Sequence, residues 1–159
     1  MKSRRKARIL AFQALYFWEA SSLEPSAQES RVSVEELLSF DWVEKEKLTN
    51  ESQLLFSRVL IAGTIENIRE IDSLIKNHLI NWDITRLNRV DLAVLRISVF
   101  TLMFQKEFSP SIVIDEAIGI CREFGTDDSF KFVNGVLDSI RKSLQENSEN
   151  ITSTKKCPL

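Results

Sequence analysis

The sequence predicts an all-α protein of about six or seven helices, and three observations lead to that class. With 4 glycines and 3 prolines in 159 residues, the chain lacks the turn residues of a β-sandwich or barrel. Apolar residues recur at spacings of three and four, which is typical of amphipathic helices. No segment alternates apolar and polar residues as a half-buried strand does. A composition of 43% hydrophobic and 28% charged residues favours a globular rather than a disordered chain.

The first half of the chain predicts three helical regions. Residues 9–18 have only one clearly polar side chain, so neighbours should bury this helix on most sides. Residues 21–50 are expected to be a polar linker followed by a variable helix at 34–47. From 51 to 79 the apolar spacing predicts one long amphipathic helix, or two with a break near Gly63.

The second half begins with a polar connector, in which Asp83 could cap a short turn. Residues 90–104 form the most apolar stretch of the chain. This stretch is too short to span a bilayer and contains Asp91 and Arg96. It therefore predicts a central core helix and no membrane partner.

Capping residues and helix-ending residues predict the limits of the last two helices. Ser109 followed by Pro110 predicts a helix start, with a capping hydroxyl and a proline at the first helical position. Gly125 lies where a left-handed C-terminal cap would end that helix. Thr126 or Asp127 could then cap the last helix.

The domain organisation is expected to be simple. We expect residues 1–144 to form a single helical domain, with the last helix ending near residue 144. Residues 145–159 lack apolar periodicity, which predicts a mobile C-terminal tail.

Basic residues are concentrated at the N-terminus, although the whole chain has a formal net charge of −2. Residues 1–18 carry five basic side chains and no acidic one, and the rest of the chain is acidic. A short basic arm (residues 1–8) on an acidic body suggests a localised anionic partner such as nucleic acid. The alternatives are a solvated, frayed terminus and, less well supported, a mitochondrial presequence.

The chain offers little material for catalysis or for metal binding. His78 is the only histidine, and Cys121 and Cys157 are too few for a disulfide framework or a four-cysteine zinc site. Asp115 and Glu116 are adjacent, so on a helix their side chains diverge by about 100°. There is no glycine-rich phosphate loop and no nucleophile elbow. We therefore expect a reduced, cytoplasmic protein without enzyme activity, metal or cofactor.

A second candidate binding segment spans residues 124–132. It contains three aromatic residues and Lys131 beside a predicted helix N-terminus, where backbone N–H groups can receive an anion. Aromatic rings there could stack on bases. The alternative is that Phe124 and Phe132 are core residues that flank a turn. Asp127 and Asp128 would repel phosphate and weaken RNA binding at this edge.

Motifs near both ends of the chain share the order and spacing of a known family. They are RRKAR at 4–8, QALY at 13–16, RVDLAVLR at 89–96, IDEAI at 114–118, FG at 124–125, DS at 128–129 and KFVNGVLD at 131–138. Together they resemble the NusB family of bacterial transcription antitermination factors, and the last motif is the most specific. Residues 21–50 fit the family poorly, and no family pattern follows residue 144.

The resemblance implies a compact fold of two helical subdomains with no enzyme activity. It also implies binding to the boxA element of ribosomal RNA leader transcripts, as a heterodimer with the small-subunit ribosomal protein NusE. That complex would join other Nus factors on RNA polymerase and prevent early termination. RNA contacts are implied for Lys2, Arg4, Arg5, Lys6, Arg8, Phe124, Asp128, Lys131 and Phe132.

Three more positions are implied at or near the partner and RNA surface, namely Tyr16, Asp91 and Arg96. Asp91 and Arg96 could instead form a polar pair at the edge of the core helix.

Two other function classes remain as alternatives. Domains similar to the NusB family also precede RNA methyltransferase domains, but this chain contains no glycine-rich cofactor loop. A pure protein-interaction module would use the basic arm only for solubility. The salt dependence of RNA binding separates this last alternative from an RNA-binding factor.

Overall fold

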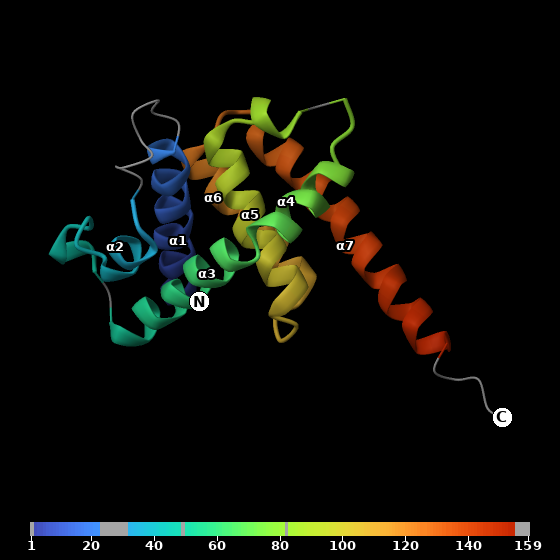
Figure 1. The fold of residues 1–159 in the computed structure, drawn as a ribbon, viewed down its shortest axis with the longest axis horizontal. Helices are drawn as coiled ribbons and strands as arrows, with labels where there is room; N and C mark the ends of the chain where they lie inside the picture. Colours follow the sequence, from blue (N-terminus) through green and yellow to red (C-terminus); the bar gives the residue numbers. More distant parts are fainter. Residues whose placement is uncertain (1, 23–31, 49, 82, 155–159) are drawn as a thin grey trace.

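The described part of the chain is mostly helical (Figure 1). This computed structural model describes residues 2–22, 32–48, 50–81 and 83–154. Within those ranges there are seven α-helices, two short 3₁₀ helices and no strand, which confirms the all-α class. The elements are α1 (Lys2–Ser21), α2 (Val34–Ser39), η1 (Lys45–Lys47), α3 (Glu51–Glu66), α4 (Ile68–Asn77), η2 (Ile84–Arg86), α5 (Arg89–Phe104), α6 (Pro110–Phe124) and α7 (Ser129–Thr154).

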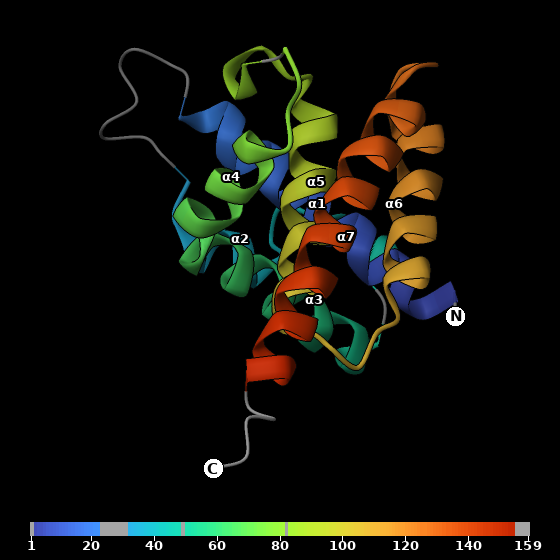
Figure 2. The same cartoon turned by 90° about the vertical axis from the view of Figure 1, so that its right-hand side faces the viewer.

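Helix α5 is the centre of the fold (Figure 2). Every residue from Asp91 to Leu102 is buried. α5 packs against α1, α3, α4, α6 and α7, while α1 and α2 both pack on α3. A helix that is apolar nearly all round must be enclosed by neighbours, so its sequence accounts for its central position.

Capping side chains begin most of the helices, several of them as predicted. Ser109 Oγ accepts a hydrogen bond from the backbone N–H of Ile112, and Pro110 follows it. Asp83 accepts from the N–H of Thr85 and starts η2. Asn88 caps α5, which begins at Arg89, one residue before the apolar stretch. These bonds satisfy backbone donors that a helix leaves unpaired at its first turn.

The long predicted helix at 51–79 is two helices, and the break lies at Asn67 rather than near Gly63. Asn67 Nδ2 donates to the carbonyl oxygen of Gly63, so the asparagine ends α3. Gly63 lies against the ring of Phe100, where a Cβ atom would collide with it. Glycine at this position therefore permits α3 and α5 to approach closely.

The helix predicted at 34–47 ends much earlier, at Ser39. Phe40 follows in the left-handed conformation with a φ of 57°, and its side chain is buried. Burial of the ring explains why a phenylalanine is kept in a conformation that usually favours glycine.

The segment around Gly125 also differs from the prediction. Its φ is −92°, so it is not a left-handed cap. A Cβ atom there would lie 2.7 Å from the Cys121 carbonyl oxygen and 2.7 Å from Ser129 Oγ, so glycine is favoured by crowding. Neither Thr126 nor Asp127 provides the side-chain oxygen that caps the next turn. Instead, Ser129 Oγ accepts from the N–H of Thr126.

Helix α7 continues ten residues past the predicted end near 144, to Thr154, and projects beyond the other helices (Figure 1). The proposed tail is therefore helical over most of its length. The predictions for residues 23–31 and 155–159, including Cys157, lie outside the described residues.

Candidate nucleic-acid interface

The basic N-terminal residues form the first turns of α1 and not a separate arm. The side chain of Lys2 lies outside the described part. Arg4 and Lys6 are exposed, Arg5 is half-buried, and Arg8 is only 6% exposed. The helix thus divides the basic cluster between the surface and the interior.

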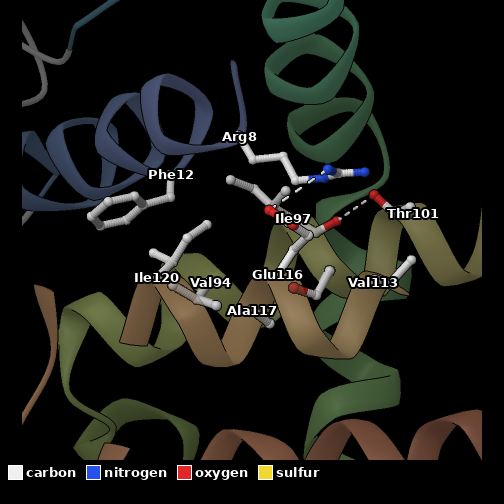
Figure 3. Close-up of a pocket in the computed structure, with 10 residues that line it drawn as sticks. Arg8, Phe12, Val94, Ile97, Thr101, Val113, Glu116, Ala117 and Ile120 are labelled. Atoms are coloured by element: carbon white, nitrogen blue, oxygen red, sulfur yellow. Dashed lines mark hydrogen bonds and ion pairs between the residues drawn. The ribbon is translucent and has the colours of Figure 1, made fainter. Parts of the chain in front are cut away.

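Arg8 is held in the interior by the carboxylate of Glu116 (Figure 3) and by two aromatic rings. Its Nη1 lies 3.9 Å from Glu116 Oε2, and its guanidinium carbon lies 5.5 Å from the Phe56 ring centroid and 5.2 Å from that of Phe108. Burial lowers the pKa of Arg8, and the Glu116 charge opposes that shift. Arg8 therefore joins α1 to α3, to α6 and to the α5–α6 turn.

The pair between Arg8 and Glu116 is incompletely satisfied. Arg8 Nη2 and Glu116 Oε2 both lack a hydrogen-bond partner. A cavity of about 10 Å³ adjoins them, with Phe12 and Val113 in its wall (Figure 3). Unmade hydrogen bonds of buried groups cost free energy, so this contact is weaker than its burial suggests.

Two other arginines of α1 take different positions. The guanidinium carbon of Arg4 lies 5.0 Å from the Phe108 ring centroid and 6.0 Å from that of Phe56. The Arg5 guanidinium lies directly over Gly119 of α6, where a Cβ atom would collide with it. Gly119 thus leaves the space in which Arg5 rests on α6.

The starts of α5 and α7, with the residues just before them, line an open cavity of about 370 Å³. It brings together three of the residues singled out from the sequence, Asp91, Asp128 and Phe132. The complete lining is Arg86, Leu87, Asn88, Asp91, Thr126, Asp128, Ser129 and Phe132. Lys131 and Phe124 lie outside this lining.

Asp91 is the least satisfied charge in the cavity wall. Its side chain is 7% exposed, and its Oδ1 has no hydrogen-bond partner. Burial raises the pKa of Asp91, and the Ser129 hydroxyl acts in the opposite direction. A buried carboxylate oxygen without a partner can accept a hydrogen bond from a bound group.

Arg96 does not pair with Asp91, so the polar pair considered for these two residues is wrong. Arg96 Nε and Nη2 donate to Asp72 at 2.9 Å each, and Nη1 donates to Glu19 at 2.9 Å. Asp72 lies on α4 and Glu19 on α1, so Arg96 joins these helices to α5. Tyr16, one turn before Glu19, is 39% exposed.

The remaining predicted aromatic contact lies against α1. Phe124 is 37% exposed, and its ring centroid lies 5.0 Å from that of Phe12. It is thus partly a packing residue and partly a surface ring. Phe132 is half-buried against the core and faces the cavity.

Sequence reasoning missed a cation–aromatic cluster between α6 and α7. The Arg122 guanidinium carbon lies 4.8 Å from the Phe130 ring centroid, and Lys131 Nζ lies 5.8 Å from it. Phe130 and Lys131 lie in the segment 124–132 that was singled out from the sequence, whereas Arg122 lies outside it and reaches Phe130 only because α6 packs on α7.

Groups that could serve other chemistry are engaged in packing. His78 Nδ1 lies 2.8 Å from Ser139 Oγ and joins the end of α4 to α7. Cys121 is fully buried, and burial raises the pKa of its thiol to about 12. The described residues contain no cluster of three or more histidine, cysteine or acidic side chains that could hold a metal ion.

None of the helices in the described ranges combines the length and the hydrophobicity that crossing a bilayer requires.

Comparison with known proteins connects this chain to a family. The sequence profile of the NusB family matches residues 5–142. The chain belongs to the NusB family. A NusB transcription antitermination protein of Treponema pallidum (strain Nichols) is 50% identical over 140 residues, 88% of this chain and 93% of that protein. A NusB protein of Borreliella burgdorferi is 37% identical over 146 residues, 91% of this chain and 97% of that protein.

Solved NusB structures have the same fold. NusB of T. maritima matches with a TM-score of 0.72 and 35% identity, over 87% of this chain and 90% of that one. NusB in a crystal structure of the antitermination factors NusB and NusE with double-stranded RNA matches with a TM-score of 0.74 and 31% identity. That match covers 90% of this chain and 98% of the other. The resemblance and the fold that it implied are therefore confirmed.

Proposed function

We propose that the protein is a transcription antitermination factor that binds the boxA element of ribosomal RNA leader transcripts together with NusE. Family membership over residues 5–142 is the observation that carries this proposal. It is supported by a related NusB that was crystallised with NusE and RNA. Other Nus factors and RNA polymerase would be reached indirectly, through this complex.

The charges of α1 suggest how the RNA backbone would be bound. Arg5 and Lys6 have no carboxylate within 4.0 Å in the described part of the chain, so they are available to phosphate oxygens. Arg4 also has no carboxylate within 4.0 Å among the described residues, and its guanidinium packs against the ring of Phe108. Arg8 would act differently, because its charge faces Glu116. We propose that Arg8 holds the helix from which the other cations reach RNA.

The cavity at the start of α7 suggests where a base would bind. Phe132 offers a ring edge or face, and Asp91 offers an unpaired acceptor. Recognition of this kind moves no covalent bond, so we propose a binding protein without catalytic activity. Because bacterial transcripts are made in the cytoplasm, we expect the protein to act there.

Binding of a labelled boxA-type RNA across a salt series, with and without NusE, tests this function. We expect binding that is specific for the RNA sequence and tighter in the presence of NusE. The double variant Arg5→Ala, Lys6→Ala should flatten the log–log salt slope by about 1.4, at about 0.7 per lost phosphate contact on a single strand. Weak binding that ignores both RNA sequence and NusE would contradict the proposal.

A further inference from the structure

We propose that Arg122 and Phe130 form a further RNA contact, which joins the basic part of α1 to the start of α7 across the outer surface of α6. The ligand is a single-stranded segment of the RNA, bound by its phosphates at Arg122 and by a base at Phe130. This inference rests on the proposed function, because it extends the same RNA-binding surface.

The path across α6 is marked by three positions at intervals of three residues. Glu116 pairs with Arg8, Gly119 lies under the Arg5 guanidinium, and Arg122 lies beside the ring of Phe130. Residues three apart are neighbours on a helix surface. The three positions therefore follow one another around α6, from the buried Arg8 of α1, past the half-buried Arg5, to the first turn of α7.

The accessible cations along this path have no acidic partner. Within the described ranges, no carboxylate lies within 4.0 Å of Arg5, Arg122 or Lys131. Some other exposed or half-buried arginines are paired with acids, as Arg58 is with Glu51 and Arg141 with Asp138. A guanidinium without a carboxylate keeps its forked donors for a phosphate.

Phe130 supplies an aromatic surface next to these charges. Its ring is half-buried, with Arg122 at 4.8 Å and Lys131 at 5.8 Å from its centroid. A ring bordered by cations suits a nucleotide, since the base can stack while the cations receive the phosphate.

Acidic side chains nearby weaken the positive electrostatic potential around Arg122 and Phe130. Glu123, Asp127 and Asp128 are exposed in the same region. Recognition here must therefore depend on the close geometry of one guanidinium and one ring, and single substitutions should have measurable effects. An acidic peptide would be attracted by net charge alone, so it should bind this surface less well than RNA does.

The test measures affinity for a single-stranded boxA-type RNA as a function of salt, in the presence of NusE. Arg122→Gln should weaken binding about fivefold at 0.1 M salt and reduce the log–log slope by about 0.7. Arg122→Lys should keep the slope, because it keeps the charge. Phe130→Leu should weaken binding while the slope stays unchanged, because stacking releases no counterion.

Arg69→Gln is the matched control, since Arg69 is an exposed arginine of α4 and its loss changes the net charge equally. It should leave affinity and slope near those of the wild type. Equal effects of Arg69→Gln and Arg122→Gln would overturn the inference and indicate a general charge effect. A loss at Arg122 that appears only as weaker NusE binding in the absence of RNA would also overturn it, in favour of a protein contact.

The outcomes separate this inference from the proposed function. If the wild-type protein fails to bind boxA-type RNA specifically, the function itself is wrong. If the wild type binds and Arg122→Gln and Phe130→Leu, both folded by circular dichroism, bind equally well, only the path across α6 is wrong.

Discussion

The first turn and the middle of α5 each hold a buried charge, and the two charges differ in how fully they are hydrogen-bonded. Arg96 is 6% exposed and Asp91 is 7% exposed, five residues apart. Arg96 donates three hydrogen bonds to two carboxylates, whereas Asp91 keeps an oxygen without a partner and borders a cavity. Equal burial thus accompanies a complete ion-pair network in the middle of α5 and an unpaired acceptor in its first turn.

This difference distinguishes a structural charge from a candidate binding group. The Arg96 network fixes α1 and α4 against α5, so its free energy should contribute to folding. An unsatisfied buried carboxylate costs free energy in the unliganded fold, and a ligand can recover it. The pair of Arg8 and Glu116 is intermediate, because it is charged and enclosed but leaves one atom of each side chain unbonded.

The largest effect is expected at the complete network. Arg96→Met should lower the free energy of unfolding by about 3 kcal/mol, because it leaves Asp72 and Glu19 without their cation. We place it at the lower end of the usual range because those two carboxylates are 22% and 26% exposed. Denaturant unfolding measures the loss, and Arg96→Lys should recover part of it. A variant as stable as the wild type would contradict a structural role for Arg96.

A smaller effect is expected at the intermediate pair. Glu116→Gln removes the negative charge that offsets the cost of burying charged Arg8, and it should lower the free energy of unfolding by about 1–2 kcal/mol. Asp115→Asn is the control, since Asp115 is the exposed neighbour of Glu116 and should change stability by less than about 0.5 kcal/mol. If both substitutions cost the same, the 3.9 Å contact contributes nothing specific.

The smallest effect, of opposite sign, is expected at Asp91, whose Oδ1 has no hydrogen-bond partner. Burial raises the pKa of Asp91, so the folded protein takes up a proton there more readily than the unfolded chain does. The charged form therefore costs stability at neutral pH, and the cost disappears as the pH falls through the raised pKa. Asp91→Asn should gain up to about 1 kcal/mol at pH 7, and less at lower pH.

The check is the difference in unfolding free energy between wild type and Asp91→Asn as a function of pH, which removes contributions from other carboxylates. A difference that stays constant with pH, or one that favours the wild type at neutral pH, would mean that the carboxylate is satisfied after all.

Local signals in the sequence were sufficient for most helices but not for the partners of buried charges. Ser109 with Pro110 and Asp83 act within three residues of themselves, so their roles could be predicted. The break at Asn67 was missed because a side chain that bonds four residues back leaves no apolar gap. Gly63 was predicted as a possible helix break and Gly125 as a left-handed cap, but both glycines instead permit close packing.

The candidate site shows the same division between local and distant information. Asp91, Asp128 and Phe132 were proposed from a family resemblance, and the fold brings them to one cavity. The burial of Arg8 could not be predicted, because Glu116 lies 108 positions away in sequence. The same holds for Arg96, whose acids lie on two other helices.

The reactivity of the buried Cys121 thiol can be used to measure how often the helical core opens. With a pKa of about 12 and no exposed surface, it stays protonated and shielded while α6 is packed. Alkylation of this sulfur therefore requires an opening of the fold, and its rate measures the population of opened molecules. A ligand that binds only the closed form should slow the alkylation in proportion to its saturation. The alkylation rate would then report the binding of RNA and NusE without a label on either of them.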